Sequence, residues 1–387
     1  MKPENSILGS YGTTIFTVMS ALAVEHGAIN LGQGFPDADG PEDIRRRAAD
    51  ALVAGPNQYP PMMGTPELRQ AVADHNRRFY GIDVDWRSGV MVTSGATEAL
   101  ADCLLGLIEP GDEVILMEPL YDSYLPIVRL AGAVPRLVRL EPPDWQLPRR
   151  ALEAAFSDRT KLAVLNSPHN PTGKVFDRDD LAFLAGLLVA HDAYAVCDEV
   201  YEHLVFDGRP HVPLMTLPGM AERCLRIGSA GKTFSMTGWK VGYVTAAPTL
   251  LTAAARAHQF ITFTTPPALQ AAVAYGLGKD DAYFRSLGRD LAIKRDRLSR
   301  GLAEAGFAML RADGTYFLTA DIRPLGFDGD DEAFCRHIAT QAGVAAVPVG
   351  AFYRDDGPRH YVRFCFCKSD AVLDEAVARL KRHFGRG

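Results

Sequence analysis

Short continuous apolar runs alternate with amphipathic stretches along the first two thirds of the chain. The runs lack the apolar–polar alternation of a half-exposed strand, so they predict strands that are covered on both faces. The predicted strands span residues 90–93, 114–117, 162–165, 193–197 and 224–227. Between them, the apolar spacing predicts helices, and this alternation favours an α/β fold with a mostly parallel sheet.

The predicted helices of this part span residues 97–107, 178–190 and 253–260. A further helix is expected to begin where Thr65 precedes Pro66, because threonine is a common N-cap and proline is tolerated in the first turn.

The last third of the chain has a different pattern. Residues 280–305 and 370–384 predict two amphipathic helices, and residues 315–318, 344–347 and 361–366 predict strands. We therefore expect a smaller α+β unit at this end of the chain.

The chain is expected to form two units. The large unit is predicted at residues 41–284, and the small unit combines residues 1–40 with residues 285–387. The chain has 387 residues, of which 47% are hydrophobic and 23% charged. These values are typical of globular proteins and exclude a disordered chain.

Charge and cysteine usage exclude several classes of protein. The formal net charge of −6 leaves no basic excess for a nucleic-acid backbone. The six cysteines form no CxxC pair and the ten histidines show no metal-ligand spacing, so we predict no metal site. The N-terminus lacks an apolar run of signal-peptide length, and the longest apolar stretch, residues 181–190, has about half the length of a membrane span. We expect a cytoplasmic protein that binds neither nucleic acid nor membrane.

Small and polar segments follow four of the predicted strands, at residues 94–98, 166–173, 198–201 and 228–233. In an open parallel sheet, ligands bind beyond the carboxyl ends of the strands, so these segments are expected to share one crevice.

The side chains of these segments complement pyridoxal 5′-phosphate (PLP). Free N–H groups at a helix start can bind a phosphate, an aspartate can pair with a protonated ring nitrogen, and Lys232 can form a Schiff base. Tyr121 can stack on the ring, while Asn170 and Tyr201 can donate to its phenolate oxygen. The candidate cofactor-binding residues are Gly95, Ala96, Thr97, Tyr121, Asn170, Asp198, Tyr201, Ser229, Lys232 and Lys240.

These motifs stand in the order of a known family. The resemblance rests on Asn-Pro-Thr-Gly at residues 170–173, Asp-Glu-Val-Tyr at residues 198–201, the Ser-Ala-Gly-Lys and Gly-Trp-Lys-Val-Gly-Tyr elements within residues 229–243, and the distal Arg363. The chain resembles the class I/II aminotransferases of the aspartate aminotransferase superfamily, the fold type I PLP enzymes. The chain departs from this pattern at Lys240, where much of the superfamily has arginine. A lysine keeps the positive charge but cannot bind a phosphate through two parallel hydrogen bonds as arginine does.

The resemblance covers nearly the whole chain, and the class I/II pattern itself is expected at about residues 29–383. Residues 11–16, 31–37 and 363–366 are similar to the methionine and kynurenine aminotransferase branch.

The resemblance implies a large domain with a mostly parallel seven-stranded sheet between helices, and a small α+β domain. It implies that Lys232 is the catalytic residue and that Tyr59 reaches the cofactor phosphate of the partner subunit in a homodimer. Arg363 stands in an apolar strand, so it needs a carboxylate partner. A structural Asp or Glu is one interpretation, and the α-carboxylate of the substrate is the one that the resemblance implies.

The resemblance also bears on the substrate. Phe260 stands where relatives acting on dicarboxylic amino acids have an arginine, so a pocket lined by Phe16, Phe260 and Phe263, beside Gly34 and Asn170, is expected. Such a pocket favours apolar, sulfur-containing or aromatic donors: methionine, phenylalanine, tyrosine, kynurenine or glutamine. The acceptor is expected to be a 2-oxo acid, with ping-pong kinetics.

Two alternatives remain open on the sequence. A PLP enzyme of the same fold could instead catalyse β-elimination on cysteine conjugates, or decarboxylation, because the first proton abstraction is shared with transamination. An effector-binding module of a transcription regulator would carry an added DNA-binding domain, whereas only about ten residues precede the resemblance here.

Overall fold

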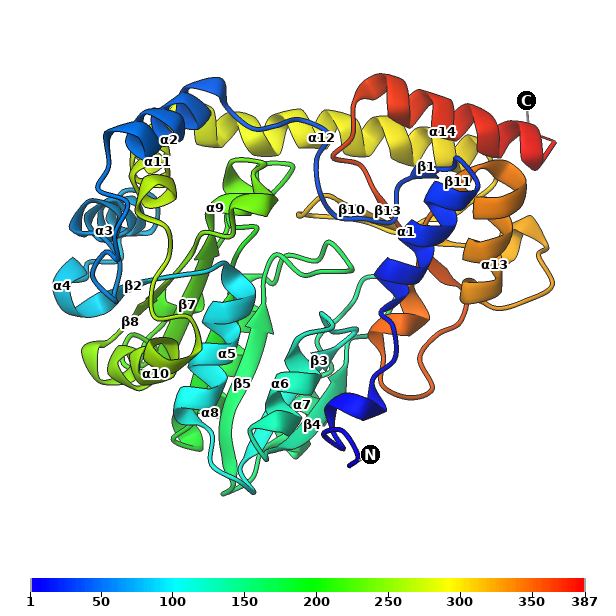
Figure 1. The fold of residues 1–387 in the computed structure, drawn as a ribbon. Coiled ribbons are helices and arrows are strands. Elements are labelled where there is room, and N and C mark those ends of the chain that lie inside the picture. The colour runs from blue at the N-terminus through cyan, green and yellow to red at the C-terminus, as the bar shows by residue number, and fades with distance from the viewer. Residues whose placement is uncertain (1, 386–387) are drawn as a thin grey trace.

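The largest sheet of the computed structural model, which describes residues 2–385, has seven strands in the order β2-β8-β7-β6-β5-β3-β4 (Figure 1). Neighbouring strands are parallel except around β8, which runs antiparallel to β2 and β7. The prediction of an α/β fold with a mostly parallel sheet is confirmed. The strands are β2 (Val90–Thr93), β3 (Glu113–Glu118), β4 (Val134–Arg139), β5 (Thr160–Asn166), β6 (Tyr194–Asp198), β7 (Cys224–Ser229) and β8 (Gly242–Ala246).

Helices surround this sheet and extend into the second unit. They are α1 (Ile15–Glu25), α2 (Glu42–Ala54), α3 (Pro66–Tyr80), α4 (Trp86–Gly89), α5 (Ala96–Leu107), α6 (Tyr124–Leu130), α7 (Arg149–Ala155), α8 (Arg178–Ala190), α9 (Ala230–Thr233), α10 (Pro248–Ile261), α11 (Pro267–Leu277), α12 (Asp281–Glu304), α13 (Asp331–His337) and α14 (Asp370–His383).

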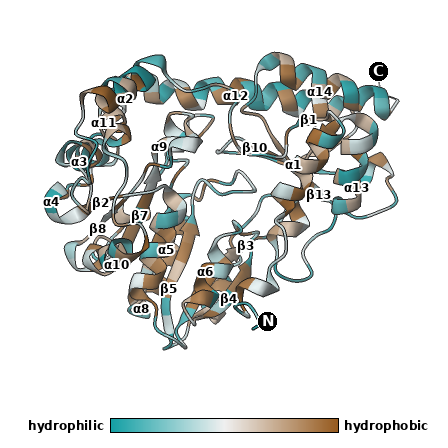
Figure 2. Cartoon of the chain, viewed as in Figure 1, coloured by the Kyte–Doolittle hydropathy of each residue, from teal (hydrophilic) through white to brown (hydrophobic). Residues whose placement is uncertain are grey.

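Alternate residues of the central strands pack on opposite faces of the sheet. On β3, Val114 and Leu116 join a core cluster with α5 and α10, whereas Ile115 and Met117 join a second cluster with α7 and α8. Because successive strand residues point to opposite faces, a strand covered on both faces must be apolar throughout. Figure 2 shows β5 and β7 in the brown of hydrophobic residues, while the outer α12 and α14 carry teal faces.

The second unit is built around a four-stranded antiparallel sheet in the order β12-β13-β10-β9. A short parallel pair, β1 with β11, ties the first residues of the chain to its last third. Helix α12 links the two units and packs along α14, and the predicted boundary after residue 284 falls inside it (Figure 1). The strands are β1 (Ile29–Asn30), β9 (Ala308–Met309), β10 (Phe317–Asp321), β11 (Val344–Ala345), β12 (Val347–Pro348) and β13 (Tyr361–Cys365).

Most predicted elements are present, with one error of interpretation. Thr65 caps α3 as predicted, since its side chain accepts from the N–H of Leu68. The single strand predicted at residues 344–347 is wrong, because β11 pairs with β1 whereas β12 pairs with β13. The break falls at Ala346, which is buried like its neighbours, so the hydrophobic pattern carries no sign of it.

Among residues 2–385, no helix combines the length and the apolar character needed to cross a bilayer.

Candidate active site

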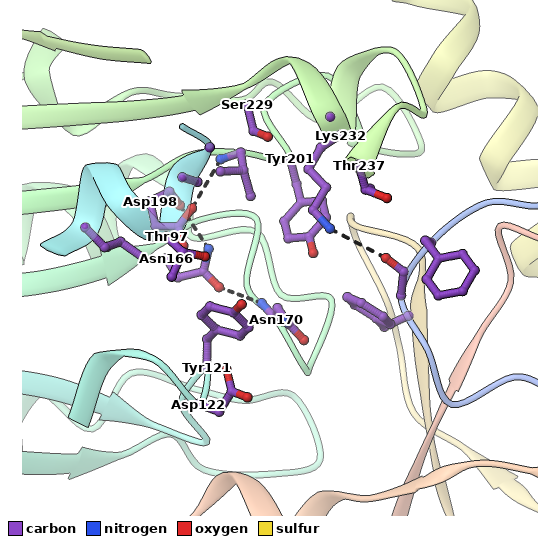
Figure 3. A pocket seen from close by; sticks show the side chains of 18 of the residues that line it. Thr97, Tyr121, Asp122, Asn166, Asn170, Asp198, Tyr201, Ser229, Lys232 and Thr237 are labelled. Atoms are coloured by element: carbon purple, nitrogen blue, oxygen red, sulfur yellow. Dashed lines mark hydrogen bonds between the residues drawn. The ribbon is translucent and has the colours of Figure 1, made fainter. Parts of the chain in front are cut away.

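The carboxyl ends of the parallel strands open into a cavity of about 440 Å³ (Figure 3). Segments after β2, β5, β6 and β7 line it together, as their positions in the sequence predict. The N-terminal segment, the residues after β3, β10 and β13 also contribute to the wall. Of the predicted site residues, the cavity is lined by Phe16, Gly34, Gly95, Ala96, Thr97, Tyr121, Asn170, Asp198, Tyr201, Ser229, Lys232, Lys240 and Arg363.

The start of α5 forms a cradle for an anion. Gly95 precedes the helix with φ +83°, a conformation that favours glycine, and a Cβ there would lie 3.3 Å from Nζ of Lys240. The lysine amine therefore lies against the helix start. The first N–H groups of a helix lack intrahelical partners, and the helix dipole favours negative charge there. Ser229 and Thr237 add hydroxyl groups to the same wall.

Asp198 ends β6 as a buried carboxylate. Its Oδ2 accepts a hydrogen bond from the Tyr124 hydroxyl at 2.6 Å, and its Oδ1 accepts a longer one from the N–H of Val200 at 3.4 Å. Burial raises the pKa of Asp198, and the Tyr124 hydrogen bond acts in the opposite direction. A protonated ring nitrogen in the cavity would give this desolvated carboxylate an ionic partner.

Lys232 extends from α9 into the cavity. Its Nζ donates to the Tyr316 hydroxyl at 2.7 Å, and that hydroxyl donates to the carbonyl oxygen of Gly34 at 2.7 Å. Burial lowers the pKa of Lys232, which brings the amine closer to the neutral form that a nucleophile or base needs.

Arg363 lies on β13 with its side chain 1% exposed. Its Nη1 donates to Oδ1 of Asn170 and its Nη2 to the carbonyl of Gly32, each at 2.8 Å. Burial lowers its pKa to about 10. Within residues 2–385 its Nε has no hydrogen-bond partner, and no ion pair of the described chain joins Arg363 to an Asp or Glu. Asp122, which lines the same cavity, acts on the pKa of Arg363 without forming an ion pair, so within the described residues one guanidinium donor stays unused.

Three predicted residues lie outside the cavity. Tyr59 is 83% exposed and packs edge-on against Phe263, which is 42% exposed. Phe260 is 84% exposed, since it lies on the outer side of the last turn of α10. Neither Phe260 nor Phe263 lines this cavity: Phe260 lies on the last turn of α10 and faces solvent, and Phe263 lies in the segment that follows α10. The aromatic residues that line the cavity are Phe16, Phe35, Tyr121, Tyr201 and Phe317.

Three residues outside the predicted set orient the predicted ones. Tyr124 and Tyr316 hold Asp198 and Lys232 as described above, and Asn166 donates to the carbonyl of Asp198 at 2.9 Å. Asn166 ends β5 directly opposite Asp198 on β6, so its place at a strand end was a usable signal. Tyr316 precedes β10 far along the chain, where no local pattern points to the cavity.

A buried ionic cluster behind the cavity holds the loop that follows β6. Arg226 on β7 donates to Oε2 of Glu199 at 2.6 Å, to Oδ1 of Asn76 at 2.6 Å and to Glu202. Glu199 and Glu202 flank Tyr201 in sequence, so the two ion pairs fix the backbone that carries this cavity residue.

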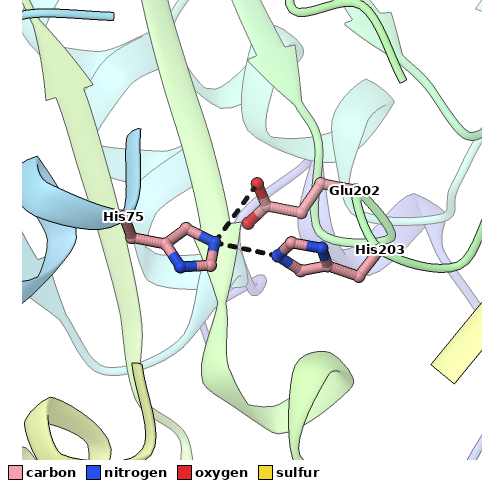
Figure 4. Close-up of side chains that lie close together, drawn as sticks. All are labelled: His75, Glu202 and His203. Carbon is pink, nitrogen blue, oxygen red and sulfur yellow. Dashed lines mark hydrogen bonds and ion pairs between the residues drawn. The ribbon is translucent and has the colours of Figure 1, made fainter. Parts of the chain in front are cut away.

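His75 and His203 adjoin this cluster (Figure 4). Their Nε2 atoms lie 2.8 Å apart, and Nε2 of His75 lies 3.9 Å from Oε2 of Glu202. Burial lowers the pKa of His75 to about 3 and that of His203 to about 4, so both imidazoles are neutral and bond to each other.

Comparison with known proteins decides the family. The sequence model of the class I and II aminotransferases matches residues 26–380, close to the predicted span. The chain belongs to the class I and II aminotransferases. Enzymes of this family depend on PLP, and the cavity of this aminotransferase offers groups that fit it: an anion cradle, a buried carboxylate lacking an ionic partner, and an amine.

Individual relatives span almost the whole aminotransferase. The solved structure of N-succinyldiaminopimelate aminotransferase from Mycobacterium tuberculosis is 47% identical, with a TM-score of 0.95 over 98% of this chain and 100% of that chain. A solved Escherichia coli protein identified with a methionine aminotransferase function is 40% identical, with a TM-score of 0.96 over 99% of this chain and 100% of that one. Kynurenine–oxoglutarate transaminase 3 of Mus musculus is 39% identical over 94% of this chain and 86% of its own length. The fold is thus fold type I.

Proposed function

We propose that this aminotransferase takes the amino group of an apolar, sulfur-containing or aromatic amino acid and transfers it to a 2-oxo acid by a ping-pong mechanism. The proposed donors are methionine, phenylalanine, tyrosine, kynurenine and glutamine. One observation carries the proposal: Arg363, whose Nε is free, is surrounded by the rings of Phe16, Phe317 and Phe352, with centroids 3.9 to 5.2 Å from its Cζ. A substrate whose α-carboxylate binds this arginine would place its side chain among aromatic rings.

The residues of the cavity have separate roles in the proposed reaction. Bound PLP supplies an electron sink for the negative charge that develops at the substrate α-carbon. Lys232 would hold the cofactor through its amine, and with that amine free it would act as the general base that takes the proton from the α-carbon. Asp198 keeps the ring nitrogen protonated, and Asn170 and Tyr201 donate to the phenolate oxygen. Arg363 orients the α-carboxylate, and the residues at the start of α5 with Ser229 and Lys240 hold the phosphate.

A homodimer is part of this proposal. Tyr59, Phe260 and Phe263 form an exposed aromatic group on this chain, as expected of side chains that a second copy would cover. We propose that Tyr59 reaches the cofactor phosphate of the partner subunit, with the two phenylalanines beside that site. A cytoplasmic location fits the six buried cysteines, which are all unpaired.

A second donor is favoured by sequence identity. The relative from Mycobacterium tuberculosis at 47% identity is named for N-succinyldiaminopimelate, which carries carboxylates beyond the one at its reacting carbon. Those carboxylates would need cationic or polar partners, whereas the wall near Arg363 is aromatic.

Steady-state kinetics on a panel of donors test these proposals. We expect kcat/KM for methionine or phenylalanine to exceed that for aspartate, with 2-oxo acid formed and no ammonia released. A higher value for N-succinyldiaminopimelate would select the second donor. Aspartate equal to methionine would contradict the argument from the aromatic wall, and pyruvate with ammonia from cysteine conjugates would instead indicate β-elimination.

A further inference from the structure

The imidazole of His258, on α10, is bonded at both ring nitrogens and fully buried. Nδ1 lies 2.8 Å from Oε1 of Glu98, and Nε2 lies 3.0 Å from the carbonyl oxygen of Met62. The carbonyl can only accept. Burial raises the pKa of Glu98, but hydrogen bonds, among them those from the Thr262 hydroxyl and the Ser94 N–H, leave it below the usual value, so Glu98 is ionised and its oxygen also accepts. Both nitrogens therefore donate, and His258 is an imidazolium cation.

Two carboxylates, both on α5, are the charged groups that face this ring. Besides Glu98, Oδ2 of Asp102 lies 3.6 Å from Nδ1, and within residues 2–385 neither oxygen of Asp102 has a hydrogen-bond partner. Burial would lower the pKa of His258, but the two carboxylates outweigh it and raise the pKa to about 9. Burial raises the pKa of Asp102 to about 6. The His258 cation is thus the main positive charge that balances the Glu98 and Asp102 carboxylates.

The hydrogen bonds of Glu98 continue to the anion cradle. Its Oε2 accepts from the backbone N–H of Ser94, the residue before Gly95. Glu98 is also the third residue of α5, and its bond to Ser94, the residue before the N-cap Gly95, ties the first turn of the helix to the segment that leads into it. The geometry of the cradle therefore depends on where the Glu98 carboxylate is held.

His258 also connects this turn to the exposed aromatic group. Its ring donates to Met62, three residues beyond Tyr59, and its carbonyl accepts from the N–H of Phe263 at 2.9 Å. Tyr59 and Phe263 pack against each other. His258 thus contacts the helix start and the Tyr59 segment through its side chain, and the Phe263 segment through its backbone carbonyl.

We propose that His258, as an imidazolium, is a positioning residue that holds Glu98, and through it the backbone of Ser94 and Gly95, in the geometry that grips the cofactor phosphate. This inference rests on the proposed role of the start of α5 as the phosphate site. His258 is not among the residues that line the cavity, so its expected effect is on cofactor retention, and the chemical step belongs to Lys232.

This role is tested by measuring the rate at which PLP leaves the holoenzyme across the pH range, with the released aldehyde trapped. We expect His258→Gln to release PLP about tenfold faster near neutral pH, as loss of one charge-assisted hydrogen bond predicts. Wild-type release should accelerate as pH rises through about 9, where His258 loses its proton, and the difference from His258→Gln should vanish above that pH. The ³¹P resonance of the bound phosphate should shift over the same range.

Asp102→Asn provides a second variant that keeps the shape of the cluster. It removes one of the two carboxylates that stabilise the cation, so the pH at which release accelerates should move to a lower value. A merely structural defect would speed release at all pH values without moving this midpoint. The variant also keeps the proposal testable if His258→Gln fails to fold.

His337→Gln is the matched control. His337 is part-buried, its Nε2 lies 3.0 Å from that of His383, and it belongs to the small unit, so we expect wild-type release from this variant. Equal release by wild type and His258→Gln, with parallel pH profiles, would overturn the role of His258. A wild-type protein that binds no PLP would instead overturn the proposed phosphate site. Stoichiometric metal in the purified holoenzyme that is lost in His258→Gln would also overturn the imidazolium, because Glu98, Asp102 and His258 are potential metal ligands.

Discussion

The guanidinium of Arg363 donates to the side-chain oxygen of Asn170 at 2.8 Å, although 193 positions separate the two residues in the chain. The bond joins β13 of the small unit to the loop after β5 of the large unit. In the proposed mechanism, Arg363 binds the substrate carboxylate and Asn170 binds the cofactor oxygen. The two recognition events therefore share one hydrogen-bond network, and a change in either residue is expected to disturb the other.

Lys232→Ala should abolish transamination while leaving PLP bound without a covalent link, because the cradle and Asp198 remain. Borohydride reduction followed by peptide mapping should place the pyridoxyl group on Lys232 in the wild type and on no residue in the variant. Labelling of another lysine in the wild type would end this assignment.

Arg363→Ala should lower kcat/KM for methionine, phenylalanine and glutamine by a similar factor. Loss of a hydrogen-bonded ion pair worth about 3 kcal/mol corresponds to about a hundredfold. All three donors share the α-carboxylate, so their ranking should not change. Arg363→Lys, which keeps the charge but not the planar donor fork, should recover only part of the loss. A change in ranking would mean that Arg363 contacts the donor side chain instead.

Tyr124→Phe should move the acidic limb of the activity profile to higher pH. Asp198 must be ionised to pair with the ring nitrogen, so activity is present above its pKa and is lost as pH falls through it. The Tyr124 hydrogen bond lowers this pKa, and its loss therefore raises the pKa. The pH dependence of kcat/KM for one donor measures the effect. An unchanged acidic limb would assign that limb to another group.

Tyr316→Phe should lower kcat/KM about tenfold with little effect on PLP content. The change removes the hydroxyl that bridges Lys232 and the Gly34 carbonyl, a loss of about 1.5 kcal/mol of positioning. Single-turnover measurements should assign the loss to proton transfer. Tyr353→Phe, whose hydroxyl has no hydrogen-bond partner within the described residues, is the control expected to behave as wild type.

Arg226→Met should lower the free energy of unfolding by about 3–5 kcal/mol, because both buried glutamates lose their guanidinium partner, even though Glu199 keeps another close side-chain partner, His211. Urea denaturation of the PLP-loaded protein measures this change. Replacing both glutamates by glutamine in the same chain should restore part of the stability. If the single variant is as stable as the wild type, water reaches the cluster and the pairs are not desolvated.

The sequence was most informative where strands are buried on both faces. The run at residues 114–117 could be placed correctly because four consecutive apolar residues bounded by turns have few other solutions. The residues at the ends of such strands, among them Asp198 and Lys232, could be predicted to converge because parallel strands end at one edge.

Residues whose position depends on the path of the whole chain could not be predicted in the same way. Tyr316 reaches Lys232 only because β10 of the small unit passes over the large one. Phe260 stands in a motif that suggested a pocket residue, but the direction of its side chain depends on the rotation of α10, and one residue of rotation turns a side chain by about 100°. His258 has no spacing motif, since its two carboxylates lie on a different helix.

The positions of the site residues along the chain set the order in which they are synthesised. The residues proposed to hold PLP end with Lys240, whereas Arg363 lies on β13, near the end of the chain. A growing chain therefore contains every group for the cofactor well before the one group that reads the substrate carboxylate. Translation that stops between these positions would leave a polypeptide with the reactive amine and the phosphate cradle but without the means to select an amino acid.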